Sequence, residues 1–120
     1  MSLYNRSVGT DGENIALVYY LKKGYRMLAR NTHSRFGELD LILEKEDTVV
    51  FVEVKTRSTA NKGMPYEAVN PRKLVTLQRN MRFYLLKNNL IKKKCKLLVC
   101  SILLNADKST KILKDYEIVL

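Results

Sequence analysis

The sequence predicts a mixed α/β domain, with a mixed central sheet flanked by helices in the order αβββαβ and room for an extra edge strand near the C-terminus. Two segments carry apolar residues at helical spacing, and shorter apolar runs between polar turns have the pattern of strands. The 120 residues, of which 46% are hydrophobic, can bury one modest core. We therefore expect a single domain over residues 1–120.

The first expected element is a helix over residues 14–23. Its apolar residues recur at helical spacing: Leu17, Tyr20 and Leu21. Gly24 supplies the stop. Thr10 and Glu13 have the spacing of a capping box, in which the glutamate reaches back to the N-cap amide. The segment from Thr10 to Glu13 would therefore form the start of this helix.

Three consecutive strands follow, and the short polar turns between them allow a meander. We expect these strands over residues 25–31, 37–44 and 49–55. The polar stretch from Ser58 to Pro65 contains a glycine and ends in a proline, so it is predicted to be a mobile loop.

A second helix begins at Asn70 and Pro71, an N-cap followed by an N1 proline, and runs to about residue 88. One of its faces is apolar: Leu74, Leu77, Met81, Tyr84 and Leu85. A basic turn then leads into a strand over residues 95–104. Residues 116–120 can add a short edge strand.

The chain is strongly basic, because lysine and arginine outnumber aspartate and glutamate by 22 to 12 and give a formal net charge of +10. This surplus favours a nucleic acid as partner over a membrane, because no basic amphipathic helix stands apart from the fold. The longest apolar stretch, residues 97–104, is too short to cross a bilayer, so we expect a cytoplasmic protein without a membrane segment. Cys95 and Cys100 are expected to be reduced core residues.

Charged side chains occupy two neighbouring strands at positions where a plain core would carry none. Strand alternation places Glu38 and Asp40 on one face. The opposite face of that strand is apolar: Leu39, Leu41 and Leu43. On the next strand, alternation likewise places Glu53 and Lys55 together. An unpaired carboxylate in such a half-buried row costs free energy, which a bound divalent cation would remove.

Two carboxylates and a lysine that converge are typical of metal-assisted hydrolysis, in which oxygen ligands hold Mg²⁺ or Mn²⁺ and the lysine orients or deprotonates a water. Each residue also has a plainer interpretation. Asp40 can be a surface-facing strand acid, and Glu53 and Lys55 can form an ordinary salt bridge. Glu13 can close the capping box or project into the cleft as a further ligand. A capping box tolerates glutamine at this position, whereas a metal ligand does not.

Basic residues would supply the surface for a nucleic acid. Three arginines bracket the expected cleft: Arg30, Arg35 and Arg57. Three further basic residues lie on one side of the second helix: Arg72, Lys73 and Arg79. Phosphates could follow this surface past the acids, although each residue alone is also explained as a solvated charge. The one histidine, His33, is expected to lie in a loop, where histidines are usually inert.

An ordered series of motifs runs through residues 9–85: Gly12-Glu13, Gly24-Tyr25, Arg30-Asn31, Gly37-Glu38-Leu39-Asp40-Leu41-Ile42, Val50-Phe51-Val52-Glu53-Val54-Lys55-Thr56-Arg57, Glu67-Ala68-Val69 and Lys73. The series resembles the YraN family, also known as UPF0102, and it is far more specific than a Glu-x-Lys pair alone. The resemblance implies a restriction-endonuclease-like fold, with a core similar to archaeal Holliday-junction resolvases.

By this resemblance, the site of PD-(D/E)xK nucleases falls on four catalytic residues: Glu13, Asp40, Glu53 and Lys55. Leu39 stands in place of the motif's proline, which is not a ligand. Glu38 belongs to the family's Gly-Glu-x-Asp signature and can pair with an arginine. Residues 96–99 depart from the family's Arg-Phe-Asp-Val pattern. Resolvase-like enzymes often work as symmetric dimers, so a homodimer is implied, although the sequence marks no interface.

We therefore expect a metal-dependent nuclease that hydrolyses branched or single-stranded DNA in repair or recombination. Asp40, Glu53 and the backbone carbonyl of Val54 would hold Mg²⁺ or Mn²⁺. Glu13 would help to hold the metal or balance its charge. Lys55 would orient the water that attacks phosphorus. The alternative is a non-catalytic nucleic-acid-binding module that serves a repair or recombination complex.

Overall fold

The computed structural model describes the backbone of residues 3–58 and 70–120, with side chains from residue 11 onward in these ranges. In them the chain forms the following helices and strands: α1 (Leu3–Lys22), β1 (Arg26–Ser34), β2 (Gly37–Lys45), β3 (Thr48–Ser58), α2 (Pro71–Lys87), β4 (Lys94–Leu104) and β5 (Thr110–Ile118). This order confirms the mixed α/β prediction, including the extra edge strand.

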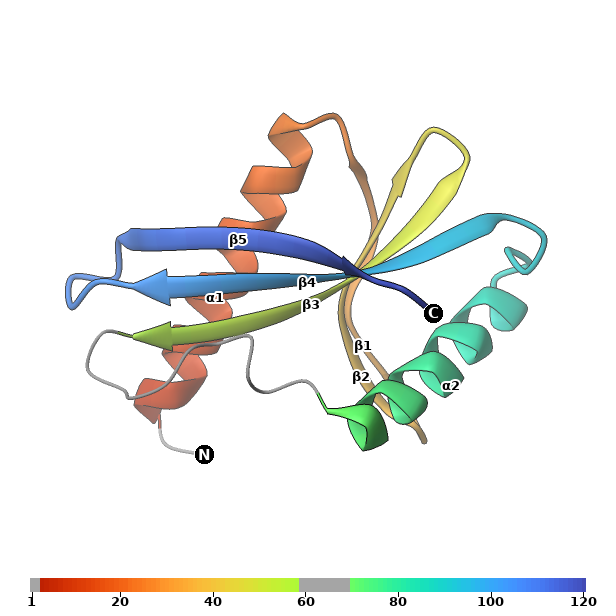
Figure 1. Cartoon of the computed structure of the whole chain (residues 1–120), viewed down its shortest axis with the longest axis horizontal. Helices are drawn as coiled ribbons and strands as arrows, with labels where there is room; N and C mark the ends of the chain where they lie inside the picture. Colours follow the sequence, from red (N-terminus) through yellow and green to blue (C-terminus); the bar gives the residue numbers. More distant parts are fainter. Residues whose placement is uncertain (1–2, 59–69) are drawn as a thin grey trace.

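The strands form one mixed sheet in which spatial order follows sequence order, from β1 at one edge to β5 at the other (Figure 1). The β3–β4 pair is parallel, and the other neighbouring pairs are antiparallel. Antiparallel neighbours can be joined by short turns, whereas a parallel pair needs a long crossover connection. The connection between β3 and β4 supplies this crossover and contains α2.

The two helices cover opposite faces of the sheet, because adjacent residues of a strand point to opposite sides. Val50 and Val52 of β3 belong to a buried cluster with Tyr20 of α1. Phe51, between them, belongs to a second buried cluster with Leu77 of α2. Removal of these apolar side chains from water holds the three layers together. Within the described residues, neither α1 nor α2 is long and apolar enough to cross a membrane.

The helix α2 begins and ends close to the predicted bounds. The side chain of Asn70 accepts a hydrogen bond of 2.9 Å from the backbone amide of Lys73, and Pro71 occupies the first helical turn. The predicted apolar face supplies the buried residues Leu77, Met81 and Leu85. The cap thus fixes where the first turn of α2, and with it Lys73, meets the sheet.

The helix α1 is longer than predicted. It begins at Leu3, so Glu13 lies in its interior and the capping-box interpretation is wrong. Gly12 does not end the helix, because it is buried against Thr56 of β3. A Cβ atom on residue 12 would lie 1.9 Å from the threonine hydroxyl oxygen. Leu21, one of the apolar residues at helical spacing, is 47% exposed.

Two strands also differ in extent from the prediction. β1 continues to Ser34, and β5 begins at Thr110, because pairing with β4 rather than an apolar pattern defines β5. Cys95 is exposed at the start of β4, so the expected burial holds only for Cys100, and both thiols are free. The predicted loop from Ser58 to Pro65 lies outside the described residues, except that Ser58 ends β3.

Candidate active site

The strands β2 and β3 separate partway along their length and leave a fork in the sheet. Their pairing starts at the turn between them and ends with Leu41 and Val52; no further pair follows within these two described strands. Beyond this point β2 continues beside β1 and β3 continues beside β4, as the two diverging groups of strands in Figure 1 show. Asp40 is therefore the first residue of β2 in the fork.

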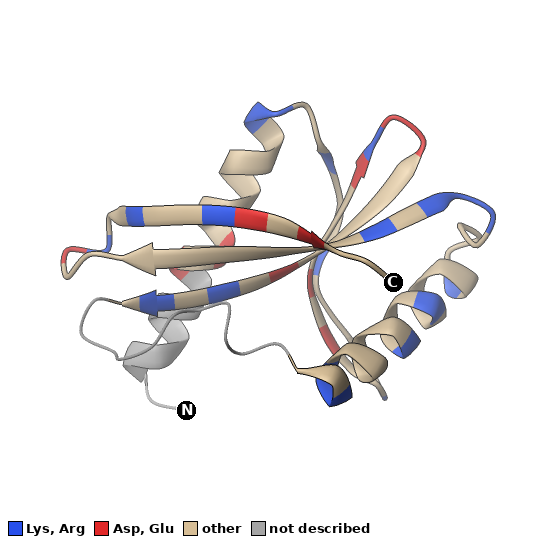
Figure 2. Ribbon diagram, viewed as in Figure 1, with Lys and Arg blue, Asp and Glu red and all other residues tan. Residues whose placement is uncertain are grey.

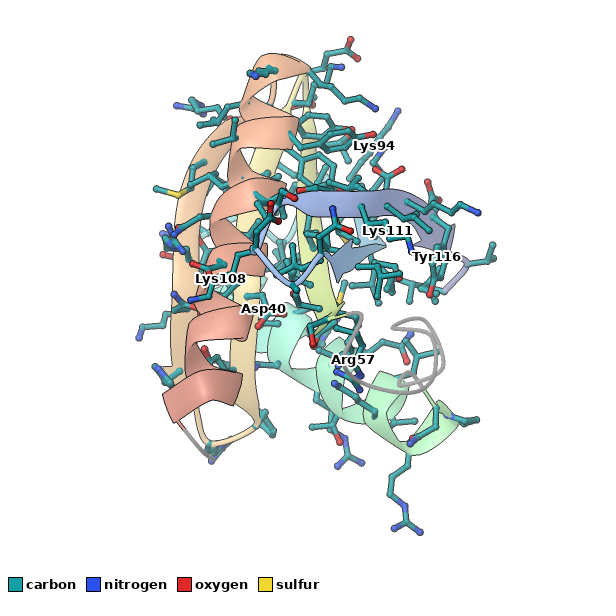
Figure 3. All side chains as sticks on the ribbon, turned by 90° about the vertical axis from the view of Figure 1, so that its left-hand side faces the viewer. Asp40, Arg57, Lys94, Lys108, Lys111 and Tyr116 are labelled. Carbon is teal, nitrogen blue, oxygen red and sulfur yellow. The ribbon has the colours of Figure 1, made fainter. Side chains whose placement is uncertain are left out.

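Asp40 bridges this fork. Its carboxylate accepts a hydrogen bond of 2.8 Å from the backbone amide of Val54 on β3, and Figure 3 shows it beside α1. Leu39 packs in the cluster on the α2 face, whereas Leu41 and Leu43 pack on the α1 face. The prediction of one shared leucine face is therefore wrong for Leu39, which lies in the part of β2 that no longer pairs with β3.

Glu13 reaches the fork from α1. Because Gly12 has no side chain, the helix lies directly against Thr56 of β3, which brings the next residue beside the fork. A nitrogen of Arg30 on β1 lies 3.7 Å from the Glu13 carboxylate and donates a hydrogen bond of 3.0 Å to Asn14. Glu13 thus projects toward the fork from the interior of α1, rather than from the predicted helix start.

Three carboxylates meet at the fork. One oxygen atom from each of Glu13, Glu38 and Asp40 lies within 4.8 Å of the other two. Oxygen donors at such a spacing suit a hard divalent cation. The sequence suggests an arginine partner for Glu38, whereas the structure groups this residue with two of the predicted site acids.

Two lysines gather around Glu53, which is buried on β3. The Nζ atoms of Lys55 and Lys73 each lie 3.3 Å from its Oε1 atom. Glu53 also lines a cavity of about 340 Å³ together with Asp40 and Lys73. The four predicted catalytic residues therefore fall into two adjacent groups: Glu13 and Asp40 lie in the fork with Glu38, and Glu53 and Lys55 lie next to them with Lys73.

Burial and crowding shift the protonation equilibria of the site. Burial, with the neighbouring charge of Glu53, raises the pKa of Asp40 to about 7. Burial also raises the pKa of Glu13. Burial and the adjacent Lys73 lower the pKa of Lys55. For Lys73 burial acts in the same direction, but its contacts with Lys55 and Glu53 outweigh it and raise the pKa. The acids of the fork are thus short of positive charge, and Lys55 releases its proton more readily than usual.

The predicted basic residues surround the fork without all touching it. Two of them contact site acids: Arg30 and Lys73. Arg35 lies in the turn between β1 and β2, over the ring of Phe36. Arg57 lies near the end of β3 and donates to a backbone carbonyl (Figure 3). Arg72 and Arg79 are exposed on α2, along which basic residues recur (Figure 2).

Two residues of the site have positions that were not predicted from the sequence. Lys73 is predicted only as a nucleic-acid contact, yet it reaches Glu53 from the first turn of α2. Asn80 is not predicted at all, although it is buried and lines the same cavity as the acids. Its spacing of three and four residues from Leu77 and Tyr84 places a polar residue on the apolar face, which is the signal that could have identified it.

The fold and the fork define a small mixed α/β protein with a carboxylate–lysine site at the centre of its sheet. A family model described as "Uncharacterised protein family UPF0102" matches residues 12–102. The chain is 53% identical over 81 residues to a UPF0102 protein of Syntrophomonas wolfei, an alignment that covers 68% of this chain and 70% of the relative. With a UPF0102 protein of Clostridium acetobutylicum it shares 36% identity over 117 residues, which cover 98% of this chain and 96% of the relative. The chain therefore belongs to the UPF0102 family, as its motifs predict.

Proposed function

We propose that this protein is a metal-dependent nuclease that hydrolyses phosphodiester bonds in DNA at the fork between β2 and β3. One observation carries the proposal: three carboxylates meet within 4.8 Å of one another beside the buried pair of Glu53 and Lys55. An ordinary structural salt bridge would balance its own charge and would not need this group of acids next to it. The excess of acids supports a site for a cation.

The donors at the fork fit a hard divalent cation, because Mg²⁺ and Mn²⁺ prefer carboxylate and carbonyl oxygens. A cation would also offset the acid repulsion that helps to raise the pKa of Asp40 to about 7. We expect three ligands: Asp40, Glu53 and the backbone carbonyl of Val54. Glu13 and Glu38 would complete the set, because their carboxylates lie with that of Asp40. When bound, Mg²⁺ or Mn²⁺ would supply Lewis acidity at a phosphoryl oxygen.

Lys55 would hold and deprotonate the attacking water. Its lowered pKa increases the fraction of neutral amine that can accept a proton. Its contact of 3.3 Å with Glu53 holds the Nζ atom beside the acids. The proton of the water would pass to Nζ as the water oxygen attacks phosphorus in line with the leaving oxygen. Lys73, whose pKa is raised, would stay charged and attract the phosphate.

On this proposal the chain is a restriction-endonuclease-like protein of the PD-(D/E)xK type, similar to Holliday-junction resolvases. Leu39, in place of the motif's proline, is buried on the α2 face and so serves packing rather than catalysis. The reaction would belong to DNA repair or recombination. A homodimer would present two sites for two opposed cuts.

The surplus of basic residues supports a DNA substrate. The formal net charge is +10, and lysines and arginines recur along α2 and near the end of β3 (Figure 2). Each phosphate that they neutralise would release counterions, so binding should weaken steeply as the salt concentration rises.

The test is to incubate the protein with labelled single-stranded, duplex, flap and four-way-junction DNA in Mg²⁺, Mn²⁺ or EDTA. We expect cleavage that requires metal and disappears in Lys55→Ala. Lys93→Ala is the matched control, because Lys93 contacts Glu44 at 2.9 Å at the other end of β2, in a lysine–glutamate pair like that of Lys55 and Glu53. Unchanged cleavage by Lys55→Ala would contradict the proposal. Binding without cleavage in every condition would favour the non-catalytic module.

A further inference from the structure

A second cavity, of about 310 Å³, lies between β1 and α2 next to the candidate active site. Asn80 lines this cavity and also the one that contains the acids, so the two cavities meet at its side chain. The volume of the second cavity is near the lower end of the range for small-ligand pockets, about 300–1,000 Å³. The cavity is therefore large enough for one small planar group beside the acids.

Asn80 offers a hydrogen-bond donor where the cavities meet. Its side chain is buried, and its Oδ1 atom accepts a hydrogen bond of 2.8 Å from the hydroxyl of Ser34. The backbone amide of Phe36 donates to the same hydroxyl at 3.0 Å, which directs the hydroxyl hydrogen toward Asn80. The amide nitrogen Nδ2 is the remaining donor of the Asn80 side chain, which lines both cavities.

Two aromatic rings and the side chain of Lys87 line the second cavity. Phe83 and Tyr84 of α2 line it, and Phe83 packs edge to face on Phe36 with ring centroids 5.8 Å apart. The ammonium group of Lys87 lies 6.0 Å from the ring of Phe83, and the guanidinium of Arg35 lies 4.9 Å from the ring of Phe36. The cavity thus combines flat apolar surfaces, positive charge and the amide donor of Asn80.

We propose that this second cavity receives an unpaired nucleobase of the DNA strand that is cut. The face of a base can stack on Phe83 or Tyr84, and stacking on aromatic side chains is a common way to bind single strands. The acceptor atoms on the base edge would meet the amide of Asn80. The phosphates on either side of the base complement Lys87 and Arg35. The inference rests on the proposed function, because it takes the scissile phosphate to lie at the fork.

The chemistry of the cavity selects between DNA structures. A paired base within a duplex is stacked on both sides and must be extruded before it can enter a protein pocket. A base in an overhang, a flap or a single strand is free of this cost. The substrate class would therefore be DNA with unpaired bases next to the cut, and a blunt duplex would be a poor substrate.

The experiment is a binding titration of labelled DNA in EDTA, where no cleavage can occur. Three probes are compared: a blunt duplex, the same duplex with a single-stranded overhang, and the same overhang built from abasic nucleotides. The abasic overhang keeps the phosphates and removes the bases. We expect it to bind about tenfold more weakly than the overhang with bases, a ratio typical of the loss of aromatic stacking.

The base-dependent difference should disappear when the cavity is altered. Phe83→Leu removes the stacking surface, and Thr32→Phe fills the cavity from β1 without removing an aromatic ring. Tyr19→Leu is the matched control, because Tyr19 is also a helix aromatic with a lysine over its ring, 4.4 Å away, and an edge-to-face aromatic neighbour. The control should keep the tenfold ratio, while both cavity variants bind the two overhangs equally.

Equal affinity of the natural chain for the two overhangs would overturn the inference, as would a tenfold ratio that persists in Thr32→Phe. The outcome is separate from that of the cleavage assay. Base-dependent binding without any metal-dependent cleavage would support the base pocket and contradict the nuclease. Metal-dependent cleavage with equal affinity for both overhangs would support the nuclease and contradict the base pocket.

Discussion

The two ends of the β2–β3 pair each carry an acidic residue of β2, but the pKa values of these two residues are shifted in opposite directions. At the turn, Glu44 contacts Lys93 at 2.9 Å and also pairs with Arg26, and both cations lower its pKa. At the fork, burial and the charge of Glu53 raise the pKa of Asp40 to about 7. Glu44 and Asp40 belong to the same strand, so the difference comes from their surroundings.

Charge balance distinguishes the stabilising cluster at the turn from the candidate site at the fork. At the turn, the negative charge of Glu44 is balanced by two cations of the chain itself, Arg26 and Lys93. At the fork, α1 adds a further acid, Glu13, to the carboxylates of β2. Ionised carboxylates at this spacing repel one another. The acid at the turn is paired with cations of the chain itself, whereas on the proposed function the fork would gain stability from an added cation.

The largest effect that we expect comes from Asp40→Asn. It should reduce metal-dependent cleavage by at least about 100-fold, the order found when one preorganised electrostatic group is removed. The rise in melting temperature on adding Mn²⁺ should also disappear, because that rise requires metal binding to the folded state. The amide can still accept from the backbone of Val54, so the fold should persist. Asp47→Asn, at the turn, is the control and should change neither quantity; cleavage retained in Asp40→Asn would remove the contrast between the two ends.

The next largest effect should follow from Gly12→Ala. In most helices this change stabilises, but here the new methyl group would collide with Thr56, and overpacking costs about 1–3 kcal/mol. The shift of α1 should also carry Glu13 away from the fork and weaken Mn²⁺ binding. Urea denaturation and Mn²⁺ titration measure the two effects. Adding Thr56→Ala should restore part of the stability; a stabilised single variant would show that α1 does not depend on this contact.

A dependence of stability on pH should have opposite signs at the two ends. The pKa of Asp40 rises from 3.8 to about 7 on folding, so the folded state holds its proton where the unfolded state has lost it. Stability therefore falls as the pH rises through this window, and Asp40→Asn should gain relative to the natural chain. Glu44 has a lowered pKa, so its contribution is present at neutral pH and is lost as the pH falls. Unfolding curves of Asp40→Asn and Glu44→Gln at several pH values check both signs.

The smallest effect should come from replacing one lysine at each end. Lys73→Gln removes a neighbouring charge that lowers the pKa of Lys55, so that pKa should rise. The acidic limb of the pH–rate profile should then move to higher pH. Lys93→Gln, at the turn, should leave the profile in place. A profile that does not move in Lys73→Gln would assign the acidic limb to a group other than Lys55.

The parts of the fold that local patterns determine were predictable from the sequence. Asn70 and Pro71 mark the start of α2, and the apolar stripe beyond them marks its buried face. The start of α1 was not predictable in this way, because Thr10 and Glu13 have the spacing of a capping box and the contact of Gly12 with Thr56 is distant in sequence. β5 carries mostly exposed residues, so only its pairing with β4 reveals its extent.

In the candidate site, too, features set by local sequence patterns were predictable, and features set by contacts distant in sequence were not. Alternation brings Glu53 and Lys55 together on one face of β3, and the structure agrees. No local pattern predicts that β2 separates from β3 at Asp40, because this separation depends on the pairing of β2 with β1 and of β3 with β4. The approach of Lys73 has the same origin, since it requires α2 to start against the fork.

The hydrogen bond between Asp40 and Val54 has a practical consequence. In a strand, a backbone amide usually donates to a carbonyl of the next strand, whose charge does not change with pH. The amide of Val54 donates instead to a carboxylate that titrates near neutral pH. Its nuclear magnetic resonance signal should therefore move with the ionisation of Asp40. The chemical shift of this one backbone amide would therefore report the charge of Asp40, without substrate and without turnover.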